Sequence, residues 1–339
     1  MKNVFYMHKL SSIGGVESFL YYLSCIYKDF TVYYREGDSE QVKRLAKNVE
    51  VRKYTKPIKC ERFFCSYGYD IQVEAKEYYH IVHYDALNVG FSPMVNEGFK
   101  YIGVSKVACK GFEAKTGHKC ELIYNIVPIK PKGIEKKKGL NLISATRLTS
   151  EKGGERINKL AKMLDNKGIE YTWTIYTNKI RYRFNSPNII VKPQKLDLTK
   201  EIEESSFLVQ LSDCESFGLS VCESLILGTP VIITDLEAFK EIGCINGKNA
   251  IICDLSMNNV DIDKIVKGLP KTSYTPLKSC WDKYLSTNSD YNPKDKVKCI
   301  TKKGIYDIEL NKHYIRNTVI ELSKERASYM ESLNYVEVL

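Results

Sequence analysis

Two glutamates, Glu215 and Glu223, have the spacing and the context of groups that bind a polar ligand. They lie in the stretch Asp213-Cys-Glu-Ser-Phe-Gly-Leu-Ser-Val-Cys-Glu-Ser-Leu-Ile-Leu-Gly-Thr-Pro-Val-Ile-Ile-Thr-Asp235. This stretch predicts a polar loop, a short helix that stops at Gly228, and a buried strand over residues 231–234. In α/β sheets, ligands bind beyond the carboxyl ends of the strands, where both glutamates are expected to fall.

Between the two glutamates, Phe217, Gly218 and Leu219 mark the predicted start of the helix. Unpaired backbone N–H groups at a helix N-terminus favour an anion such as a phosphate. A simpler interpretation is that Glu215 caps the helix and Glu223 is only solvated. That interpretation does not explain Gly218 or the shape of the polar loop.

The spacing Glu215-x7-Glu223, with Gly-Thr-Pro-Val at 228–231, resembles the retaining glycosyltransferases of family 4, of the cell-surface polysaccharide or teichoic-acid type. Such enzymes transfer a sugar from a nucleotide sugar. The resemblance implies that Glu223 accepts hydrogen bonds from the donor ribose, since a carboxylate offers two acceptor oxygens to a vicinal diol. It implies that Glu215 contacts hydroxyls of the transferred sugar.

Two cations, Arg147 and Lys152, follow the predicted strand 140–145, with Gly153-Gly154 directly behind them. When a nucleoside diphosphate leaves, negative charge builds on its phosphate, and cations stabilise that charge. The resemblance places this Arg-x4-Lys-Gly pattern against the diphosphate; the alternative is ordinary solvated charge. Paired carboxylates would also suit a glycoside hydrolase, but a hydrolase would not explain the paired cations.

A glycine loop with Gly14 and Gly15 links a predicted strand over 4–7 to a predicted helix over 16–27. This geometry lets a backbone approach a phosphate. The loop lacks G-x-G-x-x-G, so it is not the dinucleotide fingerprint. The resemblance places it near the donor diphosphate or the acceptor, and the alternative is a simple turn.

Several polar residues stand at predicted strand ends. By the resemblance, His83 stabilises the sugar and orients the acceptor, and His80 on the same strand is the competing candidate. Ser105 and Asn125 are binding candidates, or else turn residues. We expect the donor base to lie against the backbone near Val191.

Short apolar runs alternate with helix-like segments, which favours an α/β fold with parallel sheets. The charged, proline-rich segment after residue 126 predicts a linker. We expect a Rossmann-like acceptor domain over 1–132, a Rossmann-like nucleotide-sugar domain over 139–285 and a small β-rich module over 295–339. Two doubly wound domains that face each other across a cleft form the GT-B architecture, which the resemblance also implies.

The last module is predicted to contain strands over 297–301, 314–321 and 336–338 and a helix over 324–334. Its expected use is docking or homo-oligomerisation. The alternative is a tail that packs against the catalytic body.

Length and composition favour a soluble globular protein of two or more domains. The chain has 339 residues, of which 43% are hydrophobic and 27% charged. No apolar run approaches the roughly 20 residues that a membrane-spanning helix needs, so we expect a cytoplasmic protein. The 11 cysteines include no C-x2-C pair, which indicates reduced thiols rather than disulfides or a zinc site.

The formal net charge of +10 is compatible with nucleic acid, an anionic membrane or phosphate-bearing substrates. No RNA-binding or helix-turn-helix signature occurs, so no nucleic-acid partner is expected. Residues 1–130 contain 19 Lys and Arg against 14 Asp and Glu, a surplus of five cations. This surplus favours peripheral contact with the inner face of the cell membrane.

We therefore expect a glycosyltransferase of the hexosyl- or N-acetylhexosaminyl type. The expected co-substrate is a UDP-sugar, with GDP- and ADP-sugars left open, and the expected acceptor is a cell-surface glycan, teichoic-acid or lipid-linked polymer. Asp261-Ile262-Asp263 has the letters of an Asp-x-Asp metal motif but begins a predicted helix, where acids are normal, so neither a metal nor another cofactor is expected. Two alternatives remain: a nucleotide-sugar epimerase of the same shape, and a non-catalytic glycan- or nucleotide-sugar-binding protein.

Overall fold

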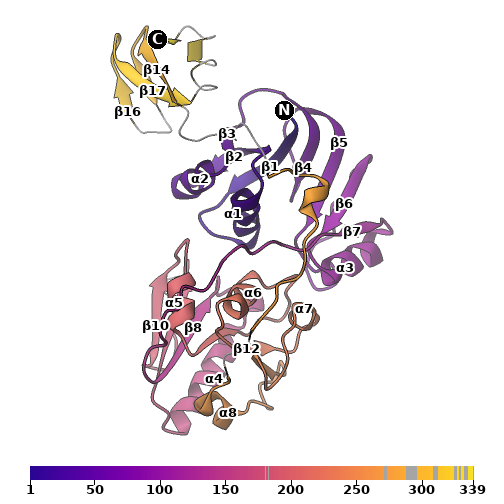
Figure 1. Ribbon diagram of the computed structural model, residues 1–339. Helices are drawn as coiled ribbons and strands as arrows, with labels where there is room; N and C mark the ends of the chain where they lie inside the picture. The colour runs from indigo at the N-terminus through magenta and orange to yellow at the C-terminus, as the bar shows by residue number, and fades with distance from the viewer. Residues whose placement is uncertain are drawn as a thin grey trace.

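The computed structural model describes residues 1–179, 181, 183–270, 273–287, 296–307, 312–323, 327, 330, 331 and 335–338. Figure 1 shows two α/β domains one above the other, with a small β-rich unit at the C-terminal end. Within the described residues, no helix is both long and apolar enough to cross a membrane.

The first domain is a parallel sheet of seven strands in the order β3-β2-β1-β4-β5-β6-β7. Its strands are β1 (Asn3–Leu10), β2 (Phe30–Gly37), β3 (Glu50–Lys53), β4 (Ile58–Cys65), β5 (Val73–Val82), β6 (Phe99–Gly103) and β7 (Cys120–Leu122). Its helices are α1 (Gly15–Ile26), α2 (Ser39–Ala46) and α3 (Lys106–Thr116). The order reverses beside β1, which makes the loop after β1 a topological switch point, where such sheets bind ligands.

The second domain is a parallel sheet of six strands in the order β10-β9-β8-β11-β12-β13. Its strands are β8 (Leu140–Ala145), β9 (Tyr171–Thr177), β10 (Ile189–Pro193), β11 (Phe207–Gln210), β12 (Val231–Thr234) and β13 (Ala250–Cys253). Its helices are α4 (Gly154–Asn166), α5 (Thr199–Glu204), α6 (Leu219–Ile226), α7 (Glu237–Glu241) and α8 (Ile262–Lys267), preceded by the 3-10 helix η1 (Ser150–Lys152). The switch point lies between β8 and β11. Arg147 and Lys152 follow β8, and Glu215 lies in the loop after β11, which leads into α6 with Glu223.

Burial on both faces explains the sequence of the central strands. β11 and β12 read Phe-Leu-Val-Gln and Val-Ile-Ile-Thr, and all eight residues are buried. Continuous apolar runs of this kind are typical of parallel strands that are covered by helices on both sides. The predicted α/β fold with two doubly wound domains is confirmed.

The chain returns to the first domain after the second sheet. The indole of Trp281, in the 3-10 helix η2 (Trp281–Lys283), is fully buried and packs against Phe5, Phe19 and Phe64. Nearby, the hydroxyl of Tyr284 donates to a carboxylate oxygen of Glu121 over 2.7 Å. This return segment belongs to the core of the first sheet, although the domain boundary expected from sequence assigned it to the second domain.

The C-terminal unit contains the antiparallel sheet β17-β14-β18 and the hairpin β15-β16. The strands are β14 (Lys296–Thr301), β15 (Ile305–Asp307), β16 (Lys312–Tyr314), β17 (Val319–Ser323) and β18 (Val336–Val338). The expected β-rich character is confirmed. Of the expected strand over 314–321, only the two ends are strand, in β16 and β17, and most of the expected helix over 324–334 lies outside the described residues.

The turn between Lys152 and α4 depends on Gly153. Its φ is +73°, and a Cβ atom there would lie 1.9 Å from the carbonyl oxygen of Leu211. Gly168 is the matched control, since its φ is +66° but a Cβ would meet no atom within 4 Å. We expect Gly168→Ala to lower the free energy of unfolding by about 1 kcal/mol and Gly153→Ala by about 2–4 kcal/mol. Urea denaturation of both variants measures the difference, and equal losses would contradict the role of the Leu211 contact.

Candidate active site

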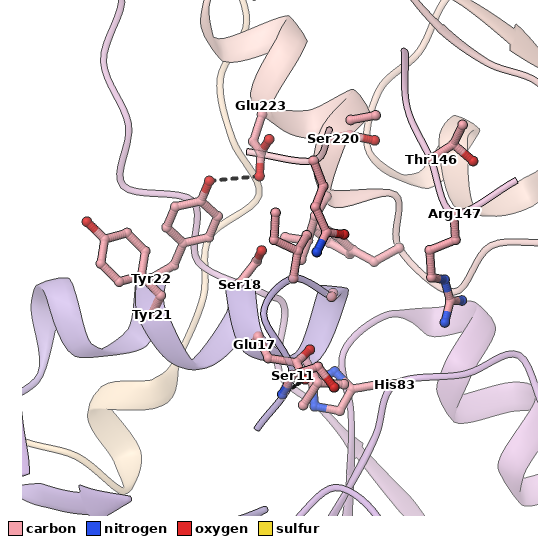
Figure 2. A pocket seen from close by; sticks show the side chains of 18 of the residues that line it. Ser11, Glu17, Ser18, Tyr21, Tyr22, His83, Thr146, Arg147, Ser220 and Glu223 are labelled. Atoms are coloured by element: carbon pink, nitrogen blue, oxygen red, sulfur yellow. Dashed lines mark hydrogen bonds between the residues drawn. The ribbon is translucent and has the colours of Figure 1, made fainter. Parts of the chain in front are cut away.

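A cleft of about 1370 Å³ lies between the two domains, and loops at the carboxyl ends of both parallel sheets line it (Figure 2). The loop after β1, the loop after β8 and the loop after β11 all contribute side chains. The sequence-predicted site residues in its lining are Gly14, Gly15, His83, Asn125, Arg147, Lys152, Glu215, Phe217, Gly218, Leu219 and Glu223. The fold thus gathers residues that are up to 209 positions apart, from Gly14 to Glu223.

Ser105 and Val191 do not line this cleft. The buried hydroxyl of Ser105 accepts a hydrogen bond from the backbone N–H of Ala108 over 3.0 Å, so it caps α3. Val191 lies inside β10, paired with Ile175 of β9. β10 continues to Pro193. The next residue, Gln194, lines the cleft.

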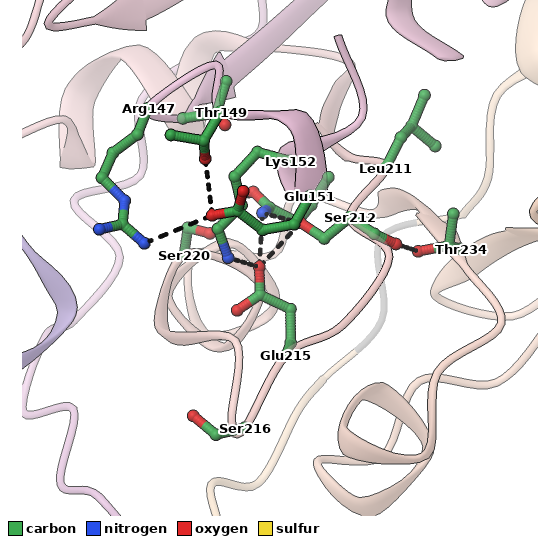
Figure 3. A network of polar contacts seen from close by, with 12 residues as sticks. Arg147, Thr149, Glu151, Lys152, Leu211, Ser212, Glu215, Ser216, Ser220 and Thr234 are labelled. Atoms are coloured by element: carbon green, nitrogen blue, oxygen red, sulfur yellow. Dashed lines mark hydrogen bonds and ion pairs between the residues drawn. The ribbon is translucent and has the colours of Figure 1, made fainter. Parts of the chain in front are cut away.

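The carboxylate of Glu215 is held by three donors that converge on a single oxygen, Oε1 (Figure 3). Lys152 Nζ lies 2.6 Å away, Gln210 Nε2 2.9 Å and Ser212 Oγ 2.8 Å. Both side chains of the Lys152–Glu215 ion pair are only 15% exposed. Among the residues that the structure describes, no hydrogen bond reaches Oε2, so this oxygen can accept from a ligand hydroxyl.

The loop that carries Lys152 is fixed against the end of β11. Arg156 Nε donates to the carbonyl oxygen of Leu211 over 2.8 Å, and the N–H of Asp213 donates to the carbonyl of Glu151 over 2.8 Å. Leu148, in the same loop, is buried with a φ of +52°, a strained conformation for a residue other than glycine. Such strain persists only where the surroundings impose it, and it is common in functional loops.

The side chain of Arg147 is much more exposed than that of Lys152. Its side chain is 63% exposed, and its guanidinium lies 3.9 Å from a carboxylate oxygen of Glu151. Exposed ion pairs of this kind contribute little to stability. Figure 2 shows the guanidinium projecting into the cleft, where it can meet an anionic ligand.

Glu223 lies deep in the cleft and is bound from the other domain. The hydroxyl of Tyr22, on α1, donates to its Oε1 over 2.7 Å. Burial raises the pKa of Glu223 from 4.5 to about 7, although the hydrogen bond from Tyr22 acts in the opposite direction. Tyr22 was not among the site residues predicted from the sequence. Helical periodicity could have found it, because Tyr22 stands seven residues after Gly15 and so lies on the same face of α1.

Further contacts hold the two domains together around the cleft. Gln194 Nε2 donates to Ser12 Oγ over 2.6 Å, and Ser216 Oγ donates to the carbonyl of His83 over 2.6 Å. Each of these pairs joins a cleft loop of one domain to a cleft loop of the other. These polar contacts stand beside an apolar core cluster that contains residues of both domains, among them Phe19 and Phe217.

Of the two candidate histidines, His83 lines the cleft and His80 does not. His80 lies within β5 and is almost fully buried beside Cys65 of β4. Burial lowers the pKa of His83 to about 3, so its ring is neutral at pH 7. Its Nε2 is buried and has no hydrogen-bond partner within the described part of the chain, which leaves it able to bind a ligand.

The Asp-x-Asp sequence at residues 261–263 forms the start of α8. Asp261 accepts from the backbone N–H of Lys264 over 2.9 Å, as the cap of α8, and Asp263 forms an exposed ion pair with Lys167. Among the described residues, no group of three or more His, Cys, Asp or Glu side chains is placed to hold a metal ion.

Comparison with known families bears on the second domain most directly. Residues 128–271 match the model of the family "Glycosyl transferases group 1". The match covers the linker and most of the second domain, which is less than half of the chain. No curated protein is similar enough in sequence to match this chain.

Solved structures resemble the whole two-domain body. HepE of Anabaena, in complex with UDP and glucose, has a TM-score of 0.61 at 12% identity, covering 78% of this chain and 89% of its own. A glycosyltransferase from Rickettsia africae ESF-5 has a TM-score of 0.54 at 14% identity, covering 78% and 88%. WaaG, a glycosyltransferase involved in lipopolysaccharide biosynthesis, has a TM-score of 0.53 at 12% identity, covering 78% and 89%. At these identities the likeness concerns the fold, which is GT-B.

The raised pKa of Glu223 predicts a pH-dependent stability. The folded protein holds the proton more tightly than the unfolded chain, so this contribution is complete below about pH 4.5 and is lost as the pH rises to about 7. We expect Glu223→Gln to show no such dependence. The free energy of unfolding of the wild type, relative to that of this variant, should therefore fall by up to about 3 kcal/mol as the pH rises through this range. Urea denaturation at pH 4.5 and pH 8 measures the difference, and a difference that does not change with pH would contradict the buried position of this carboxyl.

Proposed function

We propose that this protein is a retaining glycosyltransferase that moves a sugar from a UDP-sugar to a hydroxyl of a cell-surface glycan, teichoic-acid or lipid-linked acceptor. The observation that carries the proposal is the meeting of Lys152, Glu215, Arg147 and Glu223 in one interdomain cleft. The group 1 domain and the GT-B fold support the same activity. The retained configuration rests on the resemblance of the Glu215-x7-Glu223 pattern.

The cleft offers suitable groups for the diphosphate and the ribose of the donor. Arg147 and Lys152 supply positive charge for the diphosphate, and the first residues of α6, after Gly218, line the same cleft. A ribose hydroxyl would donate to Glu223 Oε1 and so replace the hydroxyl of Tyr22 there. A UDP-sugar is the proposed donor, in keeping with HepE, whose structures contain UDP or UDP-glucose.

In the proposed step, the bond between the anomeric carbon and the diphosphate oxygen breaks. The acceptor oxygen forms its bond to the same carbon on the same face of the sugar, and its proton passes to the leaving diphosphate. The paired cations stabilise the charge that develops on the leaving group. Glu215 Oε2 and the neutral ring of His83 are placed to hold hydroxyls of the sugar or the acceptor, without a covalent intermediate on the protein.

Incubation with a panel of nucleotide sugars tests this activity. Release of the nucleoside diphosphate is followed with and without membrane extract as a source of acceptor. Release that depends on the extract supports a transferase, and a product with retained anomeric configuration supports the stereochemistry. Interconversion of the sugar would instead identify an epimerase, and binding without turnover would identify a non-catalytic protein.

Two substitutions separate the proposed roles. We expect Arg147→Ala to lower turnover by roughly 30- to 1000-fold, because a phosphate contact is lost in the transition state. We expect Glu223→Ala to weaken UDP binding by roughly 10- to 100-fold, because a charged hydrogen-bond acceptor is lost. Steady-state kinetics and titration calorimetry measure these effects. Lys167→Ala, at an exposed ion pair outside the cleft, is the matched control; full activity in Arg147→Ala would count against the assignment.

A further inference from the structure

The loop between β5 and β6 exposes an unusual amount of apolar surface. The side chains of Leu87, Phe91, Met94 and Val95 are 56%, 55%, 42% and 41% exposed. We call these four residues the apolar lip. Large apolar residues that are exposed singly are normal, but four within nine positions of one loop are a concentration that suits an interaction surface.

The apolar lip is a structured part of the cleft rim. The ring of Phe91 packs against that of Tyr84, which lines the cleft, with their centroids 5.0 Å apart. A Cβ atom on Gly68, another lining residue, would lie 2.7 Å from the end of Met94. The carboxylate of Asp85 accepts from the backbone N–H of Leu87 over 3.1 Å. These contacts hold the lip against residues that line the cleft.

Positive charge lies beside the apolar lip on α3. A Cβ on Gly111 would lie 3.3 Å from the backbone nitrogen of Leu87, so this helix packs directly under the loop. α3 and the turn after it, residues 106–119, expose four lysines and one acid, Glu113. The lysines are Lys106, Lys110, Lys115 and Lys119.

We propose that the apolar lip inserts into the surface of an anionic lipid bilayer, with the α3 lysines on the lipid headgroups. Apolar side chains gain by leaving water for the acyl boundary, and lysines near an anionic surface add electrostatic attraction. Neither property alone selects a bilayer, but their combination does. The inference rests on the proposed function in one respect: it makes the acceptor a molecule held in the membrane, whose sugar end reaches the cleft over the lip.

Vesicle co-sedimentation of the full chain tests the proposal. The probes are phosphatidylcholine vesicles with and without phosphatidylglycerol. We expect the wild type to bind the anionic vesicles and to bind the neutral ones much more weakly. Leu87→Ser with Phe91→Ser should weaken binding to anionic vesicles at least tenfold, because two apolar side chains lose their burial. Lys110→Glu with Lys115→Glu should weaken it similarly, and added salt should abolish the effect of that pair.

A matched control uses Leu255→Ser with Val266→Ser, two side chains of the second domain that are 50% and 48% exposed. This variant should bind vesicles as the wild type does. The proposal would be overturned if the wild type did not bind anionic vesicles or if the lip variant bound them as well as the wild type does. It would also be overturned if the control variant lost as much binding as the lip variant.

Calorimetric titration with UDP separates this proposal from the proposed function. The lip variant should bind UDP as the wild type does, which also shows that it is folded. Loss of UDP binding in the lip variant would overturn the proposal, because the lip would then serve the cleft rather than the membrane. If the wild type binds vesicles through the lip but does not bind UDP, the proposed donor is wrong and the proposed role of the lip in membrane binding is supported.

Discussion

The ion pair between Lys152 and Glu215 is the interaction on which the architecture of the cleft depends. It joins the loop after β8 to the loop after β11 across the switch point of the second sheet, with both side chains largely shielded from water. Removing charges from water is costly, so such a pair persists only with good geometry and additional hydrogen bonds, which Gln210 and Ser212 supply. The pair holds a cation and an acid in fixed positions before any ligand arrives, and this pre-organisation is what electrostatic catalysis requires.

The first domain completes the site by contacts that are easy to exchange. Tyr22 reaches across the cleft to Glu223, an acid whose burial places its pKa near physiological pH. A ribose bound at Glu223 would compete with Tyr22 for the same oxygen. The Lys152–Glu215 pair therefore lies within one domain, and the hydrogen bond from Tyr22 to Glu223, which a ligand can replace, lies between the two domains.

The sequence predicted the features that depend on local patterns. Apolar runs located β8 and β12 to the residue, and the alternation of strands and helices predicted the fold. Long-range packing was not predictable in this way: Trp281 follows the second sheet but buries its ring in the first. Ser105 shows a second limit, since a serine at a strand end serves a cap as readily as a ligand, and only its partner Ala108 decides between them. α2 and β3 were missed because their sequences are mostly polar.

A crystal structure of the protein with UDP bound would show whether the paired charges hold the diphosphate. We expect the phosphates to lie within hydrogen-bond distance of Lys152 and Arg147, and the ribose hydroxyls to take the place of Tyr22 at Glu223. UDP bound outside the cleft, or inside it with the diphosphate turned away from Lys152, would show that the cleft does not bind the donor in this way.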